Sequence, residues 1–502
     1  MRTSDVVVAS ICLIVFAVCL AGGGCGCGGD KTNGTGDTDF AGDGNTADSG
    51  ISDVVYADAG PDDTADAGHL DAGGDTGSIG AGGDGGADAG AVVHVLGFTG
   101  AGFLPMHNQA KLREFLDSMG YVGEDEFYSD AVGHMQALSG GMARQEFFYV
   151  GGGVFAGQDA LYAKMDAEGF EKYGTVNPIR EAEGLDPAFE DSLTTLVEGH
   201  PEISAWQIGN EPDLLWQDFT LYPAFFIRAQ PVIRTACPSC TILLAGISNQ
   251  WSASAESHVR YDGFLGEIAK AALSGRPFDV FDFHYYKETP SANEIVAAVT
   301  GYRSLLVEHG LGEGVVFWCT ETGTYSGDPA AAEFGSRTEN DQARDLVRTV
   351  VWMAAEGVLR VFYWTVIEGW GNMGPEGFFD QMGLVYNGLG EEPALGIAAG
   401  AQKKAYTTYG LLAKSLQGTV AAGRVSSGVY RFDREQGPVY VVWDEDSSGM
   451  VTVGGIPGET VAVKDLVPDD QGKAAEYTVE VTGATVSLSV GELPQLVSPD
   501  SR

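Results

Sequence analysis

The sequence predicts an α/β protein, a (β/α)8 barrel followed by a C-terminal antiparallel β-sandwich. Between residues 92 and 417, short apolar segments alternate with segments whose apolar residues recur at helical spacing. This alternation is typical of a parallel sheet covered by helices, and a unit of about 320 residues suits eight βα units. After residue 418, apolar and polar residues alternate one by one, which is typical of antiparallel strands.

The first 25 residues have the features of an export signal. Residues 6–20 form a continuous apolar run that follows Arg2, and small residues lead from it to Cys25. The run is too short for a confident membrane span. The segment before Cys25 resembles a bacterial lipoprotein cleavage site, with Cys19 as the alternative anchor. We therefore expect an exported protein, either a lipoprotein at the cell surface or outer membrane or a secreted protein.

Residues 26–91 predict a disordered linker. Between Asp30 and Gly90 the chain contains fourteen Asp and a single Lys, among many Gly and Ala. Such a segment cannot bury enough apolar surface to offset the entropy of ordering it. The whole chain has a formal net charge of −42, which argues against nucleic acid as a partner because phosphate binding needs Lys and Arg. Neutral partners such as sugars are compatible with this charge.

The predicted barrel domain covers residues 92–417. Its strand candidates are residues 92–97, 147–150, 203–209, 241–245, 278–284, 314–320 and 360–365. The second strand is expected within residues 121–128, and the last helix within residues 400–417. A doubly wound open sheet is the alternative, but no Gly-x-Gly-x-x-Gly turn follows the first strand.

The C-terminal domain is expected to cover residues 418–502. Six short period-two segments predict strands that begin at Val429, Val439, Met450, Thr460, Tyr477 and Thr485.

In the barrel domain, Cys237 and Cys240 are two loop cysteines that can close a local disulfide in an oxidising compartment. No second cysteine pair is present to complete a zinc site, and we expect neither a metal nor a cofactor.

Two predicted strands end in a glutamate. Residues 205–209 lead directly to Asn210, Glu211 and Pro212, and residues 315–320 lead to Glu321. The ends of barrel strands face the mouth where substrates bind, so both carboxyl groups are expected there. If they lie about 5–5.5 Å apart, they suit glycoside hydrolysis with retention of configuration.

These two segments resemble the clan A glycoside hydrolases, which include family 5 cellulases and mannanases and family 39 xylosidases. The resemblance implies a retaining (β/α)8 enzyme without a metal, with Glu211 as acid/base and Glu321 as nucleophile. It also implies that Asn210 holds the sugar 2-hydroxyl. By the same resemblance, His284 and Tyr285 contact the nucleophile and the substrate, and Trp364 forms a platform for a sugar ring.

The expected function is retaining hydrolysis of a β-linked oligo- or polysaccharide. The family often carries an arginine on the second strand, whereas Gly123 and Glu124 stand in the segment expected to form that strand. This difference motivates an alternative, a catalytically inactive carbohydrate-binding surface lipoprotein on the same scaffold. A third possibility is a transferase that passes the sugar to an acceptor other than water.

Overall fold

The structure of the protein is a computed structural model. It describes residues 95–99, 109–139, 141–157, 159–178, 186–216, 218–247, 255–271, 273–328, 335–371, 378–390 and 392–499. The expected signal, the linker at residues 26–91, Cys19 and Cys25 lie outside these residues. Within the described ranges, no helix is both long enough and apolar enough to span a membrane.

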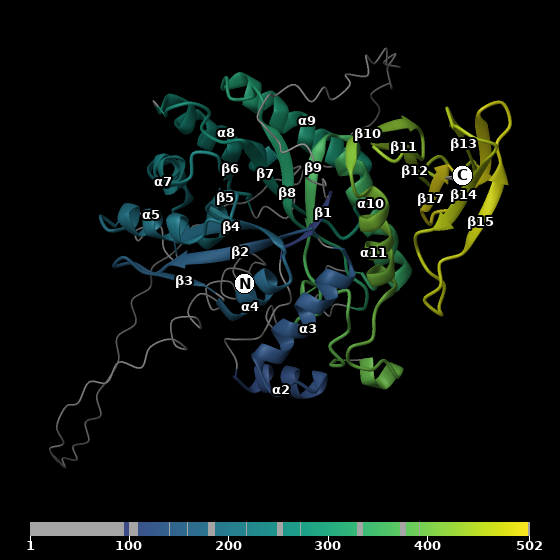
Figure 1. Ribbon diagram of the computed structural model, residues 1–502, viewed down its shortest axis with the longest axis horizontal. Helices are drawn as coiled ribbons and strands as arrows, with labels where there is room; N and C mark the ends of the chain where they lie inside the picture. The colour runs from purple at the N-terminus through teal and green to yellow at the C-terminus, as the bar shows by residue number, and fades with distance from the viewer. Residues whose placement is uncertain are drawn as a thin grey trace, which may run out of the picture. The chain divides into compact units, whose positions relative to one another are not determined.

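Eight parallel strands form a closed barrel, as the sequence predicts (Figure 1). Each strand pairs with its neighbours in the barrel, and the pairing of Phe98 with Ala143 joins the first strand to the second and closes the ring. The barrel strands are β1 (Leu96–Phe98), β2 (Met142–Tyr149), β4 (Glu171–Pro178), β5 (Ala205–Ile208), β6 (Thr241–Leu244), β7 (Val280–Tyr286), β8 (Val316–Gly323) and β9 (Val358–Tyr363).

Helices surround the barrel and cover the outward faces of its strands (Figure 1). Apolar residues from both layers join one continuous core. The helices of this part are α2 (Gln109–Met119), α3 (Glu124–Ala137), α4 (Asp159–Ala167), α5 (Phe189–Gly199), α6 (Pro212–Leu215), α7 (Tyr222–Ala236), α8 (Ala255–Lys270), α9 (Ala292–Glu308), α10 (Glu339–Ala355) and α11 (Lys404–Leu416).

The structure corrects the expected position of the second strand. Residues 121–128 enter helix α3 instead, and β2 begins at Met142, five residues before the strand candidate at 147–150. A further short strand, β3 (Phe155–Gly157), pairs antiparallel with the end of β2. Strand β4 was not predicted because polar residues and Gly174 interrupt its apolar pattern. The glycine is required there, since a Cβ atom would lie 2.5 Å from the ring of Trp206.

The inside of the barrel is layered. Its lower layer is apolar and contains Met142, Tyr173, Ala205, Leu243, Val280, Trp318 and Phe362. Two residues further along five of these strands, the inward positions become polar and remain buried: Arg144, Thr175, Gln207, Asp282 and Thr320. A buried polar layer needs internal hydrogen-bond partners, so its side chains hold one another in fixed orientations.

The C-terminal part is an antiparallel β-sandwich, as predicted. Six strands form one sheet in the order β10-β11-β12-β17-β14-β15, and β13 pairs with β16 in a second sheet. Apolar side chains from both sheets form a shared core. The strands are β10 (Thr419–Ser426), β11 (Val429–Arg434), β12 (Val439–Val442), β13 (Met450–Gly454), β14 (Thr460–Asp465), β15 (Glu476–Glu480), β16 (Thr485–Ser489) and β17 (Gln495–Pro499). The first and last of these eight were not predicted.

A disulfide and a contact between the barrel and the sandwich complete the fold. Cys237 and Cys240 form a disulfide at the end of α7. Trp352 of helix α10 donates a hydrogen bond of 2.9 Å from its indole to the hydroxyl of Tyr430 in β11. The sandwich therefore contacts the outside of the barrel through α10.

Candidate active site

Glu211 lies where β5 ends and α6 begins. Gly209 has a φ of 83°, and Glu211 itself has φ 43° and ψ 54°, a left-handed conformation that is uncommon for a residue with a side chain. Its backbone N–H donates to the carbonyl of Gly246 at 2.9 Å. Strained backbone of this kind persists only where surrounding contacts fix it, and it is concentrated at functional sites. Here it directs the Glu211 carboxyl into the barrel mouth.

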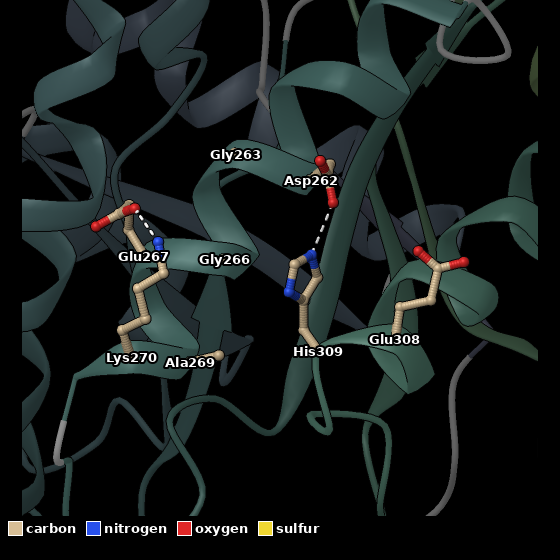
Figure 2. A pocket seen from close by; sticks show the side chains of 8 residues that line it. All are labelled: Asp262, Gly263, Gly266, Glu267, Ala269, Lys270, Glu308 and His309. Carbon is tan, nitrogen blue, oxygen red and sulfur yellow. Dashed lines mark hydrogen bonds and ion pairs between the residues drawn. The ribbon is translucent and has the colours of Figure 1, made fainter.

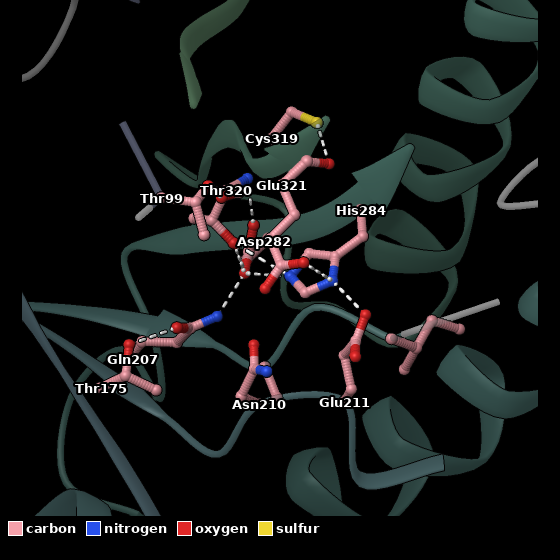
Figure 3. A network of polar contacts seen from close by, with 12 residues as sticks. Thr99, Thr175, Gln207, Asn210, Glu211, Asp282, His284, Cys319, Thr320 and Glu321 are labelled. Carbon is pink, nitrogen blue, oxygen red and sulfur yellow. Dashed lines mark hydrogen bonds and ion pairs between the residues drawn. The ribbon is translucent and has the colours of Figure 1, made fainter. Parts of the chain in front are cut away.

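Glu321 reaches the mouth because β8 contains a bulge. Phe283 of β7 pairs with Cys319, and the next residue, His284, pairs with Glu321, so Thr320 is the extra residue. A bulge re-aims the side chains that follow it. The side chain of Thr320 is therefore turned toward Asp282, while that of the adjacent Glu321 is turned toward His284 (Figure 3).

His284 joins the two carboxyl groups. Its Nδ1 lies 2.7 Å from Oε1 of Glu211 and 3.7 Å from Oε2 of Glu321 (Figure 3). One side-chain oxygen of each glutamate and one ring nitrogen of His284 all lie within 4.8 Å of one another. The structure thus brings together Glu211, His284 and Glu321 from three different strand ends. All three side chains are buried.

The surroundings separate the pKa values of the two carboxyl groups. Burial and then the charge of Glu321 raise the pKa of Glu211 to about 7. Burial alone would raise the pKa of Glu321 as well, but His284 and Arg144 outweigh it and lower that pKa. Burial opposes a charged imidazole, yet Glu321 and Glu211 raise the pKa of His284 to about 9. Near neutral pH, one glutamate can therefore carry a proton while the other is ionised.

Sequence reasoning missed Arg144. Its Nη1 donates to Oε1 of Glu321 at 2.6 Å and to Oδ1 of Asn210 at 3.1 Å, and its Nη2 lies 3.2 Å from Glu146. The sequence predicts the second strand near Gly123, whereas Arg144 stands on the strand that is second in the barrel, β2. The sequence pattern that indicates this arginine is residues 142–150, where Arg144 stands a few residues before the apolar end of a strand.

Asn210 lies at the mouth, as the resemblance implies. Its side chain is buried, and its Oδ1 accepts from Arg144, as described above. The backbone N–H of Asn210 donates to Oδ1 of Asn177 at the end of β4, at 3.4 Å. The amide is thus fixed beside the two glutamates.

The structure replaces Tyr285 with Tyr286 among the candidate site residues. Side chains alternate along β7, so His284 and Tyr286 face the mouth and Tyr285 faces helix α9. The Tyr285 hydroxyl contacts Glu294 of α9 at 3.4 Å and belongs to the core outside the barrel. The Tyr286 hydroxyl instead donates to Oε2 of Glu321 at 3.0 Å. The predicted tyrosine, Tyr285, therefore faces away from the mouth, and Tyr286 of the same strand faces it.

Trp364 directly follows β9 and is partly buried. It packs against a small aromatic cluster that includes Tyr286 and Tyr325, together with Phe378 and Met382. The peptide bond that joins it to Thr365 is cis. Its packing in this cluster places Trp364 on the same side of the mouth as Tyr286, with part of its side chain exposed.

A surface hollow lies elsewhere on the molecule. It has a volume of about 500 Å³, and residues of helix α8 and the end of α9 line it, among them Asp262, Gly266 and His309 (Figure 2). Its His309 hydrogen-bonds Asp262 at 2.8 Å. None of its lining residues belongs to a strand end, so the hollow is separate from the candidate active site.

The same three side chains could also offer ligands to a metal ion. Glu211, His284 and Glu321 each provide one ligand atom within the 4.8 Å span. However, the guanidinium of Arg144 already pairs with Glu321, and a fixed positive charge in direct contact with a ligand weakens the binding of a cation. The donor set therefore suits acid–base chemistry better than a divalent metal.

Comparison with known proteins supports the fold. The chain matches no protein-family model and none of the curated proteins. Among solved structures, it resembles a family 39 glycoside hydrolase from Bacteroides cellulosilyticus, with a TM-score of 0.56, 15% identity, and coverage of 75% of this chain and 79% of that one.

Two further structures show the same similarity. A glucosidase from Croceicoccus marinus has a TM-score of 0.54 and 12% identity, with coverage of 73% of this chain and 90% of that one. A family 51 α-L-arabinofuranosidase from Thermotoga petrophila has a TM-score of 0.52 and 11% identity, with coverage of 81% and 97%. At these identities the likeness concerns the fold, and the function is argued from the site.

Proposed function

We propose that this protein hydrolyses O-glycosidic bonds with retention of configuration, with Glu211 as acid/base and Glu321 as nucleophile. The observation that carries the proposal is the pair of buried carboxyl groups at one barrel mouth, close together and with pKa values displaced in opposite directions. A short separation leaves no room for water between a base and the sugar, which favours direct attack by a carboxylate.

In this mechanism the first step forms a glycosyl-enzyme. Glu211 gives its proton to the leaving oxygen, and the ionised Glu321 attacks the anomeric carbon. In the second step Glu211, now a carboxylate, accepts a proton from water as that water attacks the same carbon and releases Glu321. Arg144 and Tyr286 both donate hydrogen bonds to Glu321, so they hold it ionised and oriented.

The substrate is proposed to be a β-linked oligo- or polysaccharide. Asn210 and Trp364 supply an amide and an aromatic face at the mouth, which suit sugar hydroxyls and the apolar face of a sugar ring. The similarity to a family 51 α-L-arabinofuranosidase adds α-L-arabinofuranosides as a second substrate class to test.

The experiment is a screen of aryl β-glycosides, aryl α-L-arabinofuranosides and polysaccharides, with wild type beside Glu321→Gln. We expect release by wild type and a loss of several orders of magnitude in the variant, with an unchanged melting temperature. Asp345→Asn, a change at a buried carboxyl group of helix α10, is the matched control and should keep full activity. An unchanged rate in Glu321→Gln contradicts the assignment.

Azide separates the two carboxyl roles. In Glu211→Ala, azide can attack the accumulated glycosyl-enzyme and should give a glycosyl azide of retained configuration. In Glu321→Ala, azide can take the place of the missing nucleophile and should give the inverted product. Identical configurations from both variants contradict the proposed division of roles.

The inactive carbohydrate-binding protein remains the alternative function. The sequence analysis considers this alternative because the segment expected to form the second strand contains no arginine. In the structure Arg144 pairs with Glu321, so this argument for the alternative no longer holds. Binding of oligosaccharides without any hydrolysis across the whole panel would favour this alternative. Transfer to sugar acceptors is distinguished by product analysis with an excess of acceptor.

We also propose that the protein is exported and anchored through a lipid at Cys25. The apolar run and small residues before this cysteine support the proposal. Metabolic labelling with a fatty acid, in wild type and Cys25→Ser, tests it. Label retained in the variant contradicts anchoring at Cys25.

A further inference from the structure

Asp282 is a buried carboxyl group that the proposed mechanism does not use. It lies on β7 two residues before His284, faces the barrel interior, and its side chain is fully shielded from solvent. Its Oδ2 is 3.9 Å from Nε2 of His284, too far for a hydrogen bond. An isolated charge at such a place is strongly unfavourable unless hydrogen bonds compensate it.

Three donors compensate Asp282 (Figure 3). The backbone N–H of Thr320 donates to Oδ1 at 3.0 Å, and the Thr320 hydroxyl donates to Oδ2 at 2.7 Å. Gln207 donates from Nε2 to Oδ2 at 2.6 Å. The Gln207 amide is fixed in this orientation because its Oε1 accepts from the hydroxyl of Thr175 at 2.7 Å. Since every neighbour donates, the arrangement fits an ionised Asp282 above about pH 6, the value to which burial raises its pKa.

The Thr320 hydroxyl then determines which nitrogen of His284 carries hydrogen. Its single hydrogen is used toward Asp282, so toward His284 its oxygen can only accept. The Nε2 of His284 lies 3.1 Å from this oxygen and must therefore carry a hydrogen. The other nitrogen, Nδ1, is the one that lies 2.7 Å from Glu211.

We propose that Asp282 is a positioning residue that acts through Thr320 to keep a hydrogen on Nε2 of His284, so that Nδ1 remains the partner of Glu211. Nδ1 then accepts a hydrogen bond from the Glu211 carboxylic acid when His284 is neutral. When His284 is charged, Nδ1 donates to the Glu211 carboxylate. The same contact thus serves both protonation states of Glu211 that the proposed hydrolysis needs, and in this respect the inference rests on the proposed function.

Other titratable groups near this chain of contacts do not replace Asp282. Glu211 and Glu321 approach Nδ1 of His284, and Glu146 and Arg144 act on it from further away, with Arg144 paired to Glu321 and Glu146. Burial raises the pKa values of Tyr173, Tyr261 and Cys319 well above their usual range, so these neighbours stay neutral. On the Nε2 side of His284, within the described residues, Asp282 is therefore the group that supplies negative charge.

The test uses the full-length resting protein and needs no substrate. Ring ¹⁵N NMR of histidine-labelled protein gives the protonated nitrogen and the titration midpoint of His284, whose signals are identified by their loss in His284→Asn. We expect the neutral ring to carry hydrogen on Nε2. In Asp282→Asn we expect the midpoint to fall by about one pH unit or more, because a negative charge is removed.

Two variants of Thr320 test the same inference even if the Asp282→Asn variant does not fold. Thr320→Val removes the hydroxyl and should lower the midpoint, whereas Thr320→Ser retains the hydroxyl and should restore it. Asp279→Asn is the control, since its carboxylate pairs with Arg234 and Arg276 directly before β7, at the opposite end of that strand from His284, and should leave the midpoint unchanged. A neutral ring with hydrogen on Nδ1, or a midpoint unaffected by Asp282→Asn and by Thr320→Val, overturns the inference.

The NMR result also separates this inference from the proposed function. If no glycoside is cleaved but the His284 midpoint moves as expected, the hydrolase proposal fails and the positioning role stands. If hydrolysis is found, the basic limb of the kcat/KM profile should move to higher pH in Asp282→Asn and Thr320→Val, because a His284 that loses its proton more readily lowers the pKa of Glu211 less. A fall in kcat without any movement of that limb would indicate only a structural role and contradict the proposal.

Discussion

Gly246 leaves room for His284. A Cβ atom at Gly246 would lie 2.4 Å from both Cδ2 and Nε2 of the His284 ring, and 2.9 Å from Oδ2 of Asp282. Contacts below about 3 Å are forbidden to real side chains, so one of the groups would have to move. Gly246, the second residue after β6, thus helps fix the ring that contacts both glutamates, without contributing a side chain of its own.

Gly246→Ala is therefore expected to displace the imidazole and reduce kcat by about tenfold or more, because the hydrogen bond to Glu211 is lost. Steady-state kinetics on an aryl glycoside measures this effect. Gly263→Ala is the matched control, since a Cβ atom there meets nothing within 4 Å on helix α8. That variant should keep its activity and gain about 0.5–1 kcal/mol of stability from its helix propensity. Equal activity in both variants contradicts the role of Gly246.

Arg144→Lys is expected to lower kcat/KM by about 10-fold to 100-fold, the range for a lost charge-assisted hydrogen bond. Arg144→Met should in addition raise the pKa of Glu321, because a positive charge that lowers it is removed. Glu321 must be ionised to attack, so the acidic limb of the kcat/KM profile should move to higher pH. Arg360→Lys, at the opposite end of the barrel strands, serves as the control. An acidic limb that does not move in Arg144→Met contradicts this assignment.

The two neighbouring tyrosines of β7 should respond differently to the loss of a hydroxyl. Tyr286→Phe removes a donor to Glu321 and is expected to reduce kcat by about tenfold. Tyr285→Phe should keep kcat and lose about 0.5–1.5 kcal/mol of stability, because its hydroxyl bridges to Ser291 and Glu294 outside the barrel. Steady-state kinetics gives kcat, and thermal unfolding gives the stability, of both variants. A loss of kcat in Tyr285→Phe with an unchanged kcat in Tyr286→Phe would place Tyr285, and not Tyr286, at the site.

The raised pKa of Glu211 predicts both a rate profile and a stability profile. Glu211 must be protonated to act as an acid, so kcat/KM should fall as pH rises through about 7. Since its pKa is higher in the folded state than the usual 4.5, the folded state binds the proton more tightly. The stability this contributes is fully present below pH 4.5 and is lost between about 4.5 and 7.

Glu211→Gln removes this ionisation. Its unfolding free energy relative to wild type should increase as pH rises from 4.5 to 7 and stay constant above that. Chemical denaturation at several pH values measures the difference. A difference that is independent of pH would mean that the pKa of Glu211 is not raised in the folded protein.

The sequence alone predicted the features that depend on local pattern. Alternating apolar strands and helical segments predicted the barrel, and period-two segments predicted the sandwich. The placement of Glu211 and Glu321 at strand ends was also a local inference, because strand ends in a barrel all open on one mouth. Strand β4 and the start of β2 escaped prediction, since Arg144 and Thr175 are polar residues on their interior faces and Gly174 interrupts the apolar outer face of β4.

Tertiary structure decided which side chains meet at the mouth. Arg144 contacts Glu321 across 177 positions of the chain, a contact that exists only when the barrel closes. The inward orientation of Tyr286 and the bulge at Thr320 depend on the register of β7 against β8. Register and closure arise from packing between distant strands, and a one-residue shift turns every side chain to the other face. The local sequence pattern therefore determined the strands, while the packing of the barrel determined the members of the site.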